Sequence, residues 1–253
     1  MRRDCDDRSP QKVTTMKLSS PIYHLKHRAK RLSRDARIPL HAALDQVAAQ
    51  EGYKSWSMLA QRSSASMSGK DLYQSLQAGD LVLIGARPGH GKTLLSLEIL
   101  IEAMKDGKRG LFFSLDYNEK DVASRFDYLG TRPALFSDRF VFDSSDAISA
   151  SYVAERLSRE PAGSFAVIDY LQILDQKRDK PELMVQINAL KAFAREHAMT
   201  IICISQVDRS FDAEVKLCPD LDDVRLPNPL DLSLFNKTCF LNNGTVRLQL
   251  NGN

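Results

Sequence analysis

A glycine-rich segment near the middle of the chain constrains its fold more than any other feature. Before it, Leu81-Val82-Leu83-Ile84 is a short apolar run typical of a buried strand, and after it residues 94–100 have the apolar content of a buried helix. The segment between them reads Ala86-Arg87-Pro88-Gly89-His90-Gly91-Lys92-Thr93. A strand, a glycine-rich turn and a helix in this order are the context in which a phosphate loop is expected.

Each part of this segment suits the binding of a nucleotide's phosphates. Glycines let the backbone turn sharply and point successive N–H groups at one place, and the helix start adds its own unpaired N–H groups. In such a loop Lys92 reaches the β- and γ-phosphates, and the Thr93 hydroxyl is a ligand of Mg²⁺. Ala86 departs from the usual first glycine, although Gly85 precedes it. A surface loop with a chance Gly-Lys-Thr is the competing interpretation, and the flanking strand and helix favour nucleotide binding by residues 86–93.

The charge of the chain is distributed unevenly. Residues 1–62 carry 13 Lys and Arg against 6 Asp and Glu, whereas the rest of the chain carries 22 against 26. A basic first part indicates an anionic polymer or surface as a partner, with a solvated basic tail as the alternative. The four cysteines show neither metal-ligand spacing nor a disulfide framework, and no apolar segment reaches membrane-spanning length. A cytoplasmic location is therefore expected.

The composition divides the chain into four regions. Residues 1–16 are polar and predicted to be disordered, 17–62 form a basic helical unit, 63–69 a linker, and 70–253 the main domain. Whether translation starts at Met1 or Met16 stays open. In the helical unit, apolar positions at helical spacing predict three helices whose inner faces carry Ile22, Leu25, Ala29 and Leu32; Leu40, Ala43, Leu44 and Val47; and Trp56 and Leu59. Polar and basic residues, His24 among them, are expected around the rest of the first helix.

The main domain alternates strand and helix patterns. Apolar strands are predicted at residues 110–115, 140–142, 165–169 and 200–205, with helices from about Glu119, at 147–157 and around 183–194. Such alternation predicts a parallel sheet with helices on both faces. The end of the chain, residues 238–250, reads as a β-hairpin with its turn at Asn243-Gly244. Asp169 ends a buried strand, where a carboxylate is costly unless a cation receives it.

The ordered motifs resemble those of the ATPase domain of replicative DnaB-type helicases, which has the RecA fold. The motifs are the phosphate loop, Phe113-Ser114-Leu115-Asp116, Ile168-Asp169-Tyr170-Leu171-Gln172 and Ser205-Gln206-Val207-Asp208-Arg209. The resemblance covers roughly residues 75–250 and implies an α/β, RecA-like phosphate-loop NTPase with a mostly parallel central sheet. It also implies ATP hydrolysis with Mg²⁺, oligomeric assembly as a hexamer, and single-stranded DNA as a partner.

The resemblance assigns roles to individual residues. It places the phosphates on Lys92, and Mg²⁺ on Thr93 and Asp169. Gln206 is expected to sense the γ-phosphate and to couple it to the DNA-facing loop that follows. The family's general base is a glutamate whose position is taken here by Asp116, which is one methylene shorter. An ordinary loop carboxylate is the alternative for Asp116, and Arg87 receives no role.

Two departures from the family affect assembly. The large N-terminal collar that recruits primase is replaced by the small basic unit, which is a candidate DNA contact. The family's Lys-x-Arg finger, which reaches the neighbouring subunit's ATP site, is matched only by Lys237, because Cys239 stands where the arginine belongs. Arg247 and Arg209 are the candidate substitutes. A homo-oligomer or an assembly with another ATPase is expected, and slow hydrolysis by the isolated chain.

Three functions compete at this point. The favoured one is an ATP-dependent motor or remodelling ATPase on single-stranded DNA. The second is an ATP-gated DNA-binding regulator, or helicase accessory factor, with little turnover of its own. The third is a small-molecule kinase, against which the Asp-Tyr-Leu-Gln motif at residues 169–172 stands.

Overall fold

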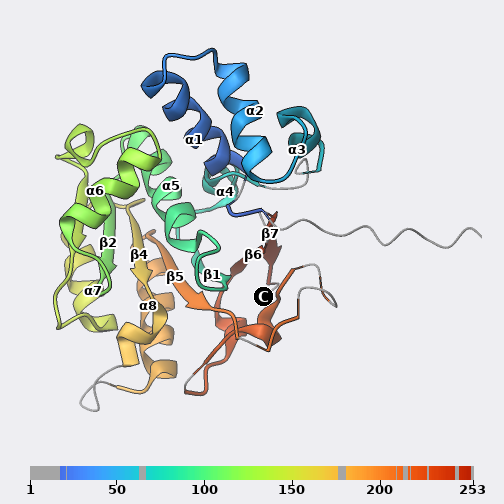
Figure 1. Cartoon of the computed structure of the whole chain (residues 1–253). Coiled ribbons are helices and arrows are strands. Elements are labelled where there is room, and N and C mark those ends of the chain that lie inside the picture. The colour runs from blue at the N-terminus through green and yellow to red at the C-terminus, as the bar shows by residue number, and fades with distance from the viewer. Residues whose placement is uncertain are drawn as a thin grey trace, which may run out of the picture.

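The computed structural model describes residues 18–20, 22–62, 67–175, 181–208, 210–212, 216, 218–226, 228–242 and 245–251. Its centre is a seven-stranded sheet in the order β3-β2-β4-β5-β1-β6-β7, parallel except for β7, which runs antiparallel to β6 (Figure 1). The strands are β1 (Leu81–Ala86), β2 (Gly110–Ser114), β3 (Phe140–Asp143), β4 (Phe165–Asp169), β5 (Thr200–Gln206), β6 (Lys237–Asn242) and β7 (Thr245–Leu250). The predicted mostly parallel sheet is confirmed.

Helices cover both faces of this sheet. One face packs against α4 (Gly69–Ser75), α5 (Lys92–Lys105) and α6 (Glu119–Tyr128), and the other against α7 (Ala150–Leu157) and α8 (Leu183–Glu196). Two separate apolar clusters result, one on each side of the sheet. The central strands β1, β2, β4 and β5 are buried on both faces, apart from the half-buried end of β5, which explains why they read as continuous apolar runs. Short 3₁₀ turns η1 to η4 lie at Pro133–Phe136, Leu171–Asp175, Leu221–Asp223 and Leu232–Leu234.

Capping side chains set where the helices begin. Asn118 accepts hydrogen bonds from the backbone N–H groups of Lys120 and Asp121, so α6 begins at Glu119 as expected. Ser149 caps α7 in the same way, and this helix therefore begins at Ala150 rather than at residue 147. Ser68 caps α4, whose first residue, Gly69, falls within the stretch expected to be linker. The division into regions stays a prediction, since residues 1–17 and 63–66 lie outside the described ones.

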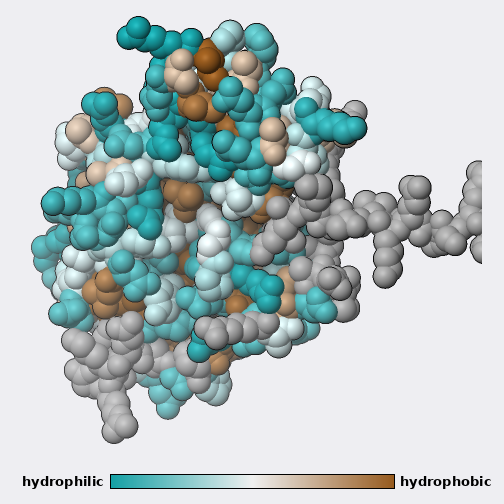
Figure 2. All heavy atoms as spheres, viewed as in Figure 1, coloured by the Kyte–Doolittle hydropathy of each residue, from teal (hydrophilic) through white to brown (hydrophobic). Residues whose placement is uncertain are grey.

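The N-terminal unit consists of α1 (Ile22–Asp35), α2 (Leu40–Gln50) and α3 (Trp56–Arg62), and it has a small core of its own. Two expectations about it were wrong. Leu40, placed on the inner face of α2, is 41% exposed, because it is the first residue of the helix and extends past the core. His24, expected among the solvated residues of α1, is fully buried. Figure 2 shows mainly hydrophilic residues over this unit, with a few hydrophobic ones between them.

His24 is buried because the N-terminal unit rests on the main domain. Its Nε2 lies 3.8 Å from Glu98 Oε2 of α5, and its ring meets the edge of Tyr128 at the end of α6. The Arg31 guanidinium lies 5.6 Å from the centre of the same tyrosine ring. The unit therefore leans on the main domain. No helix among the described residues is long and apolar enough to cross a membrane.

Candidate nucleotide site

The phosphate loop lies at the carboxyl end of β1, as the sequence predicts. Gly89 and Gly91 have φ angles of +78° and +87°, a region that L side chains rarely adopt, and Lys92 begins α5. Ala86 is the last residue of β1, is fully buried and pairs with Gln206 of β5. It is not among the residues with a positive φ, so a Cβ fits where the usual pattern has glycine.

Asp169 stands directly beside the loop. The Thr93 hydroxyl donates a hydrogen bond of 2.8 Å to Asp169 Oδ2. Burial raises the pKa of the Asp169 carboxyl to about 6, although the Thr93 hydrogen bond and the charge of Lys92 act to lower it. Two oxygen groups of this kind, one of them a costly buried carboxylate, are donors that suit Mg²⁺. The residues present therefore fit the metal that the resemblance implies.

Lys92 and Asp116 complete the charged part of the site. Burial lowers the pKa of the Lys92 ammonium, and the charges of Asp169 and Asp116 act to raise it. Asp116 lies two residues beyond Ser114, which pairs with Asp169 across β2 and β4. The Ser114 hydroxyl accepts a hydrogen bond of 3.2 Å from the Asp116 backbone N–H and so supports this turn. The structure thus brings Asp116, Lys92 and Asp169 into one electrostatic group.

Gln206 occupies the adjoining strand end. It is half-buried at the end of β5, next to Ala86 of the phosphate-loop strand, and its backbone carbonyl accepts a 2.8 Å hydrogen bond from the Arg225 N–H. The next residue, Val207, bridges to Val224. Gln206 therefore links the phosphate-loop edge to the segment that follows β5. Arg209 in that segment lies outside the described residues.

Sequence reasoning missed part of the site. A cavity of about 390 Å³ beside the loop is lined by Gly89, Gly91, Lys92, Thr93, Leu94, Tyr117, Ser124, Arg125 and Tyr128. The Arg125 guanidinium lies 3.8 Å from the centre of the Tyr117 ring and donates from Nη1 to the Asp121 carbonyl at 2.9 Å. The signal was available, since Arg125 is two turns along the helix that follows Asp116. Arg87, which received no role, lies 5.8 Å from the Phe211 ring centre.

The structure corrects the partial match to the family's basic finger. Lys237 begins β6 and pairs in register with Val82 near the start of β1. It therefore lies at the other end of these strands from the phosphate loop, which follows Ala86. It is buried, and its Nζ lies 2.5 Å from Asp80 Oδ2 and 2.8 Å from the Ser75 carbonyl. Cys239 is also buried within β6. Both residues are therefore held inside the fold, whereas Arg247 is exposed on the edge strand β7.

Comparisons with known proteins agree with this geometry. "Replicative DNA helicase DnaB" of Helicobacter pylori is 27% identical over 180 residues, which cover 58% of this chain and 37% of the relative. "Probable replicative DNA helicase" of Trieres chinensis is 29% identical over 187 residues, which cover 61% of this chain and 41% of the relative. The chain thus spans about two fifths of the length of these relatives.

Solved structures share the fold. A structure of a DnaB-like replicative helicase and its interactions with primase matches with a TM-score of 0.54 and 18% identity over 85% of this chain and 64% of that one. Another, described as an ATPase domain, matches with a TM-score of 0.53 and 18% identity over 72% of this chain and 79% of that one. A family model, "DnaB-like helicase C terminal domain", matches residues 68–132 and 134–228. This match covers more than half of the chain, which therefore belongs to the DnaB-like helicase C-terminal domain family.

Proposed function

We propose that this protein is an ATPase that couples ATP hydrolysis to movement along, or remodelling of, single-stranded DNA. One observation carries the proposal. Thr93 of the phosphate loop is hydrogen-bonded to Asp169, and Asp116 lies close enough to influence the pKa of Asp169. A carboxylate placed to bind Mg²⁺ beside a phosphate loop is the arrangement that phosphoryl transfer from ATP requires.

Each residue has a role that follows from its surroundings. Lys92 binds the β- and γ-phosphates, and its ammonium is stabilised when their negative charge arrives. Thr93 and Asp169 hold Mg²⁺, which neutralises phosphate charge when bound. Asp116 accepts a proton from the attacking water as the general base. Gln206 senses the γ-phosphate and passes its presence to the segment after β5, with which its backbone is already bonded.

The cavity beside the loop adds two further contacts to this proposal. Arg125 is fixed over the Tyr117 ring, and both residues line the cavity together with Lys92 and Thr93. A guanidinium held in this way carries its charge toward the site without the entropy cost of ordering a free side chain. We therefore assign Arg125 to contact with the nucleotide.

We also propose that the chain assembles as members of its family do. The chain works as a homo-oligomer, hexameric in the family, or together with another ATPase, and the N-terminal unit is one of its DNA contacts. A second candidate, the ATP-gated DNA-binding regulator with little turnover, is favoured by one observation. The family's finger is missing here, since Lys237 is tied to Asp80 and Cys239 lies inside the sheet.

ATP hydrolysis measured with and without oligo(dT) separates the candidates. Strong acceleration by the oligonucleotide is expected for the motor, and binding without acceleration indicates the regulator. Lys92→Ala is the matched inactive variant, which should fold normally yet lose the thermal stabilisation by Mg-ATP that the wild type shows. Full stabilisation of Lys92→Ala would show that the phosphate loop is assigned wrongly. An unaccelerated ATPase that binds no DNA would favour the kinase instead.

A further inference from the structure

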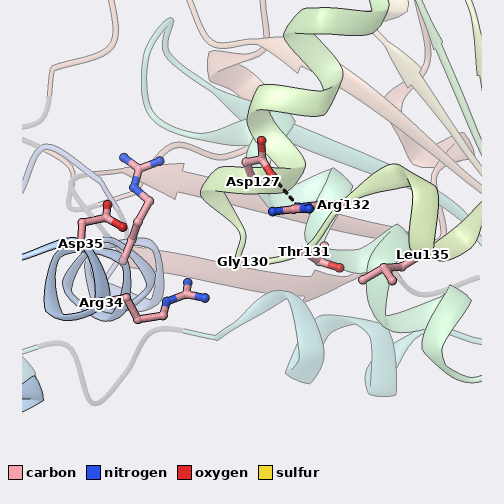
Figure 3. Close-up of a pocket in the computed structure, with 8 residues that line it drawn as sticks. Arg34, Asp35, Asp127, Gly130, Thr131, Arg132 and Leu135 are labelled. Carbon is pink, nitrogen blue, oxygen red and sulfur yellow. Dashed lines mark ion pairs between the residues drawn. The ribbon is translucent and has the colours of Figure 1, made fainter. Parts of the chain in front are cut away.

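A hollow lies between the N-terminal unit and the ATPase domain, and arginines from both parts line it. Its volume is about 610 Å³, and it separates the C-terminal half of α1 from the turn after α6 (Figure 3). A second hollow of about 460 Å³ adjoins it and shares Arg34 and Gly130. We call the first hollow the arginine cleft; its lining residues are Arg31, Arg34, Asp35, Asp127, Gly130, Thr131, Arg132 and Leu135.

The positive charge of the arginine cleft is not neutralised by its own acids. Within the described part of the chain, neither Arg31 nor Arg34 forms an ion pair, and Arg31 instead rests on the Tyr128 ring. Arg132 pairs with Asp127 only at 3.8 Å, and their side chains are 80% and 60% exposed, so this pair is weak. Lys30 adds another positive charge in the adjoining hollow.

The arginines converge from opposite walls. In Figure 3 the Arg34 side chain extends from α1 toward the turn that carries Gly130, Thr131 and Arg132. Gly130 has a φ of +79°, which L side chains rarely adopt, and it forms the turn that faces His27 of α1. Guanidinium groups on two facing walls of a concave surface concentrate positive potential between them. Such a space attracts an anion with more than one phosphate.

Size and apolar character narrow the class of ligand. Hollows of roughly 300–1,000 Å³ hold ligands of a few rings, and the space here suits a short stretch of a single strand. Leu135 is 71% exposed beside the arginines and Leu40 is 41% exposed in the adjoining hollow. Unstacked bases pack on apolar side chains and on guanidinium planes, which a base-paired duplex cannot use because its bases are stacked inside.

We propose that the arginine cleft binds the phosphate backbone of single-stranded nucleic acid. The inference rests on the proposed function and deepens it, since it places one DNA contact on both the N-terminal unit and the ATPase domain. Tyr128, which carries Arg31, also lines the cavity beside the phosphate loop. A strand in the arginine cleft and a nucleotide in the site therefore lie against the same helix, α6.

The test is the binding of fluorescein-labelled oligo(dT) to the full chain, followed by anisotropy over a range of salt, with and without a non-hydrolysable ATP analogue. Arg34→Gln combined with Arg132→Gln should weaken binding roughly tenfold and flatten the slope of log affinity against log salt by about 1.4, since each single-strand phosphate contact adds about 0.7. Lys26→Gln combined with Lys120→Gln is the matched control, because it removes two exposed charges from α1 and α6 outside the arginine cleft.

A second variant, expected to strengthen binding, tests whether the loss in the arginine variant is due to misfolding. Asp35→Asn removes a negative charge from the arginine cleft and should strengthen binding two- to threefold, which a damaged fold would not do. If the wild type binds normally and the arginine variant has the same slope of log affinity against log salt, the proposal that the arginine cleft binds single strands is wrong. The proposed function would not be affected by that result. The same affinity and the same loss for a duplex hairpin would also overturn the proposal for the arginine cleft. A wild type that does not bind oligo(dT) under any condition would overturn both.

Discussion

Two of the buried acidic side chains of this molecule, Asp169 and Glu98, have pKa values that burial raises, and they lie in different settings. The first belongs to the nucleotide site, and the second to the contact between the N-terminal unit and the main domain. At the phosphate loop, burial raises the pKa of Asp169 to about 6, against a lowering by the Thr93 hydrogen bond and the Lys92 charge. At the joint of α1 with α5, burial raises the pKa of Glu98 to about 8, with the nearby charge of Glu102 adding to the effect. Both carboxyls lose hydration, and both have groups nearby that favour the charged form: the Thr93 hydroxyl and the Lys92 charge for Asp169, and the Gly69 N–H and the Lys105 charge for Glu98. The pKa of Glu98 is nevertheless raised further than that of Asp169.

The partner of Glu98 completes the contrast. Burial lowers the pKa of His24 to about 3, and the charge of His27 lowers it further. Both groups are therefore neutral near pH 7, and their 3.8 Å contact is packing rather than an ion pair. In this pair of sites, the buried acid beside a hydroxyl, a lysine and the phosphate loop suits a metal, and the buried acid beside a neutral histidine belongs to a sealed interface.

The largest expected effect tests whether the nucleotide site is complete within one chain. A basic finger is worth roughly 10³–10⁵ in turnover, and the described residues offer Arg247 on the edge strand as a candidate. Specific ATPase activity should therefore be low in dilute protein and rise with concentration and with oligo(dT), in step with the mass measured by light scattering. Arg247→Gln should abolish the rise. A stable hexamer with fast, DNA-independent turnover would show that a different finger exists.

The next effect tests the general base. Asp116→Asn should lower turnover by about 10²-fold or more, because the amide cannot accept the proton of the attacking water. ATP binding should persist, since Lys92, Thr93 and Asp169 remain. Steady-state hydrolysis and nucleotide titration on the same sample measure the two properties. Near-normal turnover would show that Asp116 is an ordinary loop carboxylate and not the general base.

A third test uses the acidic partner of the metal. Mg²⁺ requires an ionised ligand, so Mg-ATP affinity should be constant well above pH 6 and fall by about tenfold per pH unit below it, where Asp169 takes up a proton. Calorimetric titration of Mg-ATP across this range measures the effect. Asp169→Asn is the control and should bind Mg-ATP weakly at every pH. A wild-type affinity that does not change between pH 7 and pH 5 would contradict the assignment.

The smallest effect concerns the joint. The folded chain keeps the Glu98 proton up to about pH 8 whereas the unfolded chain releases it near pH 4.5, so Glu98 makes stability fall as pH rises through this window. Between pH 6.5 and 8, above the window of His24, the loss should be about 2 kcal/mol. Urea unfolding measures it. Glu98→Gln should remove the loss, whereas Glu196→Gln, at an exposed position, should retain it.

The phosphate-loop edge could be predicted from the sequence because its signals are local. Residues 86–93 lie in one continuous segment. Asp169 and Gln206 end buried strands and Asp116 lies just beyond one, so parallel pairing brings them to the same edge of the sheet. The antiparallel pairing of β6 with β7 could likewise be predicted, from two strand-like segments on either side of an Asn-Gly pair. Periodicity and strand ends carry this information without knowledge of the packing.

Only the tertiary structure decided the features that depend on packing between distant elements. The pattern of α1 could not show that His24 faces Glu98, because the face of a helix that meets another domain looks like any polar face in sequence. Nor could it show that Lys237 is held by Asp80, since 157 residues separate the two along the chain. The sequence by itself determined the fold class and the phosphate-binding edge through short-range patterns. The joint, the arginine cleft and the fate of Lys237 were decided by long-range contacts, which form only when the folded elements meet.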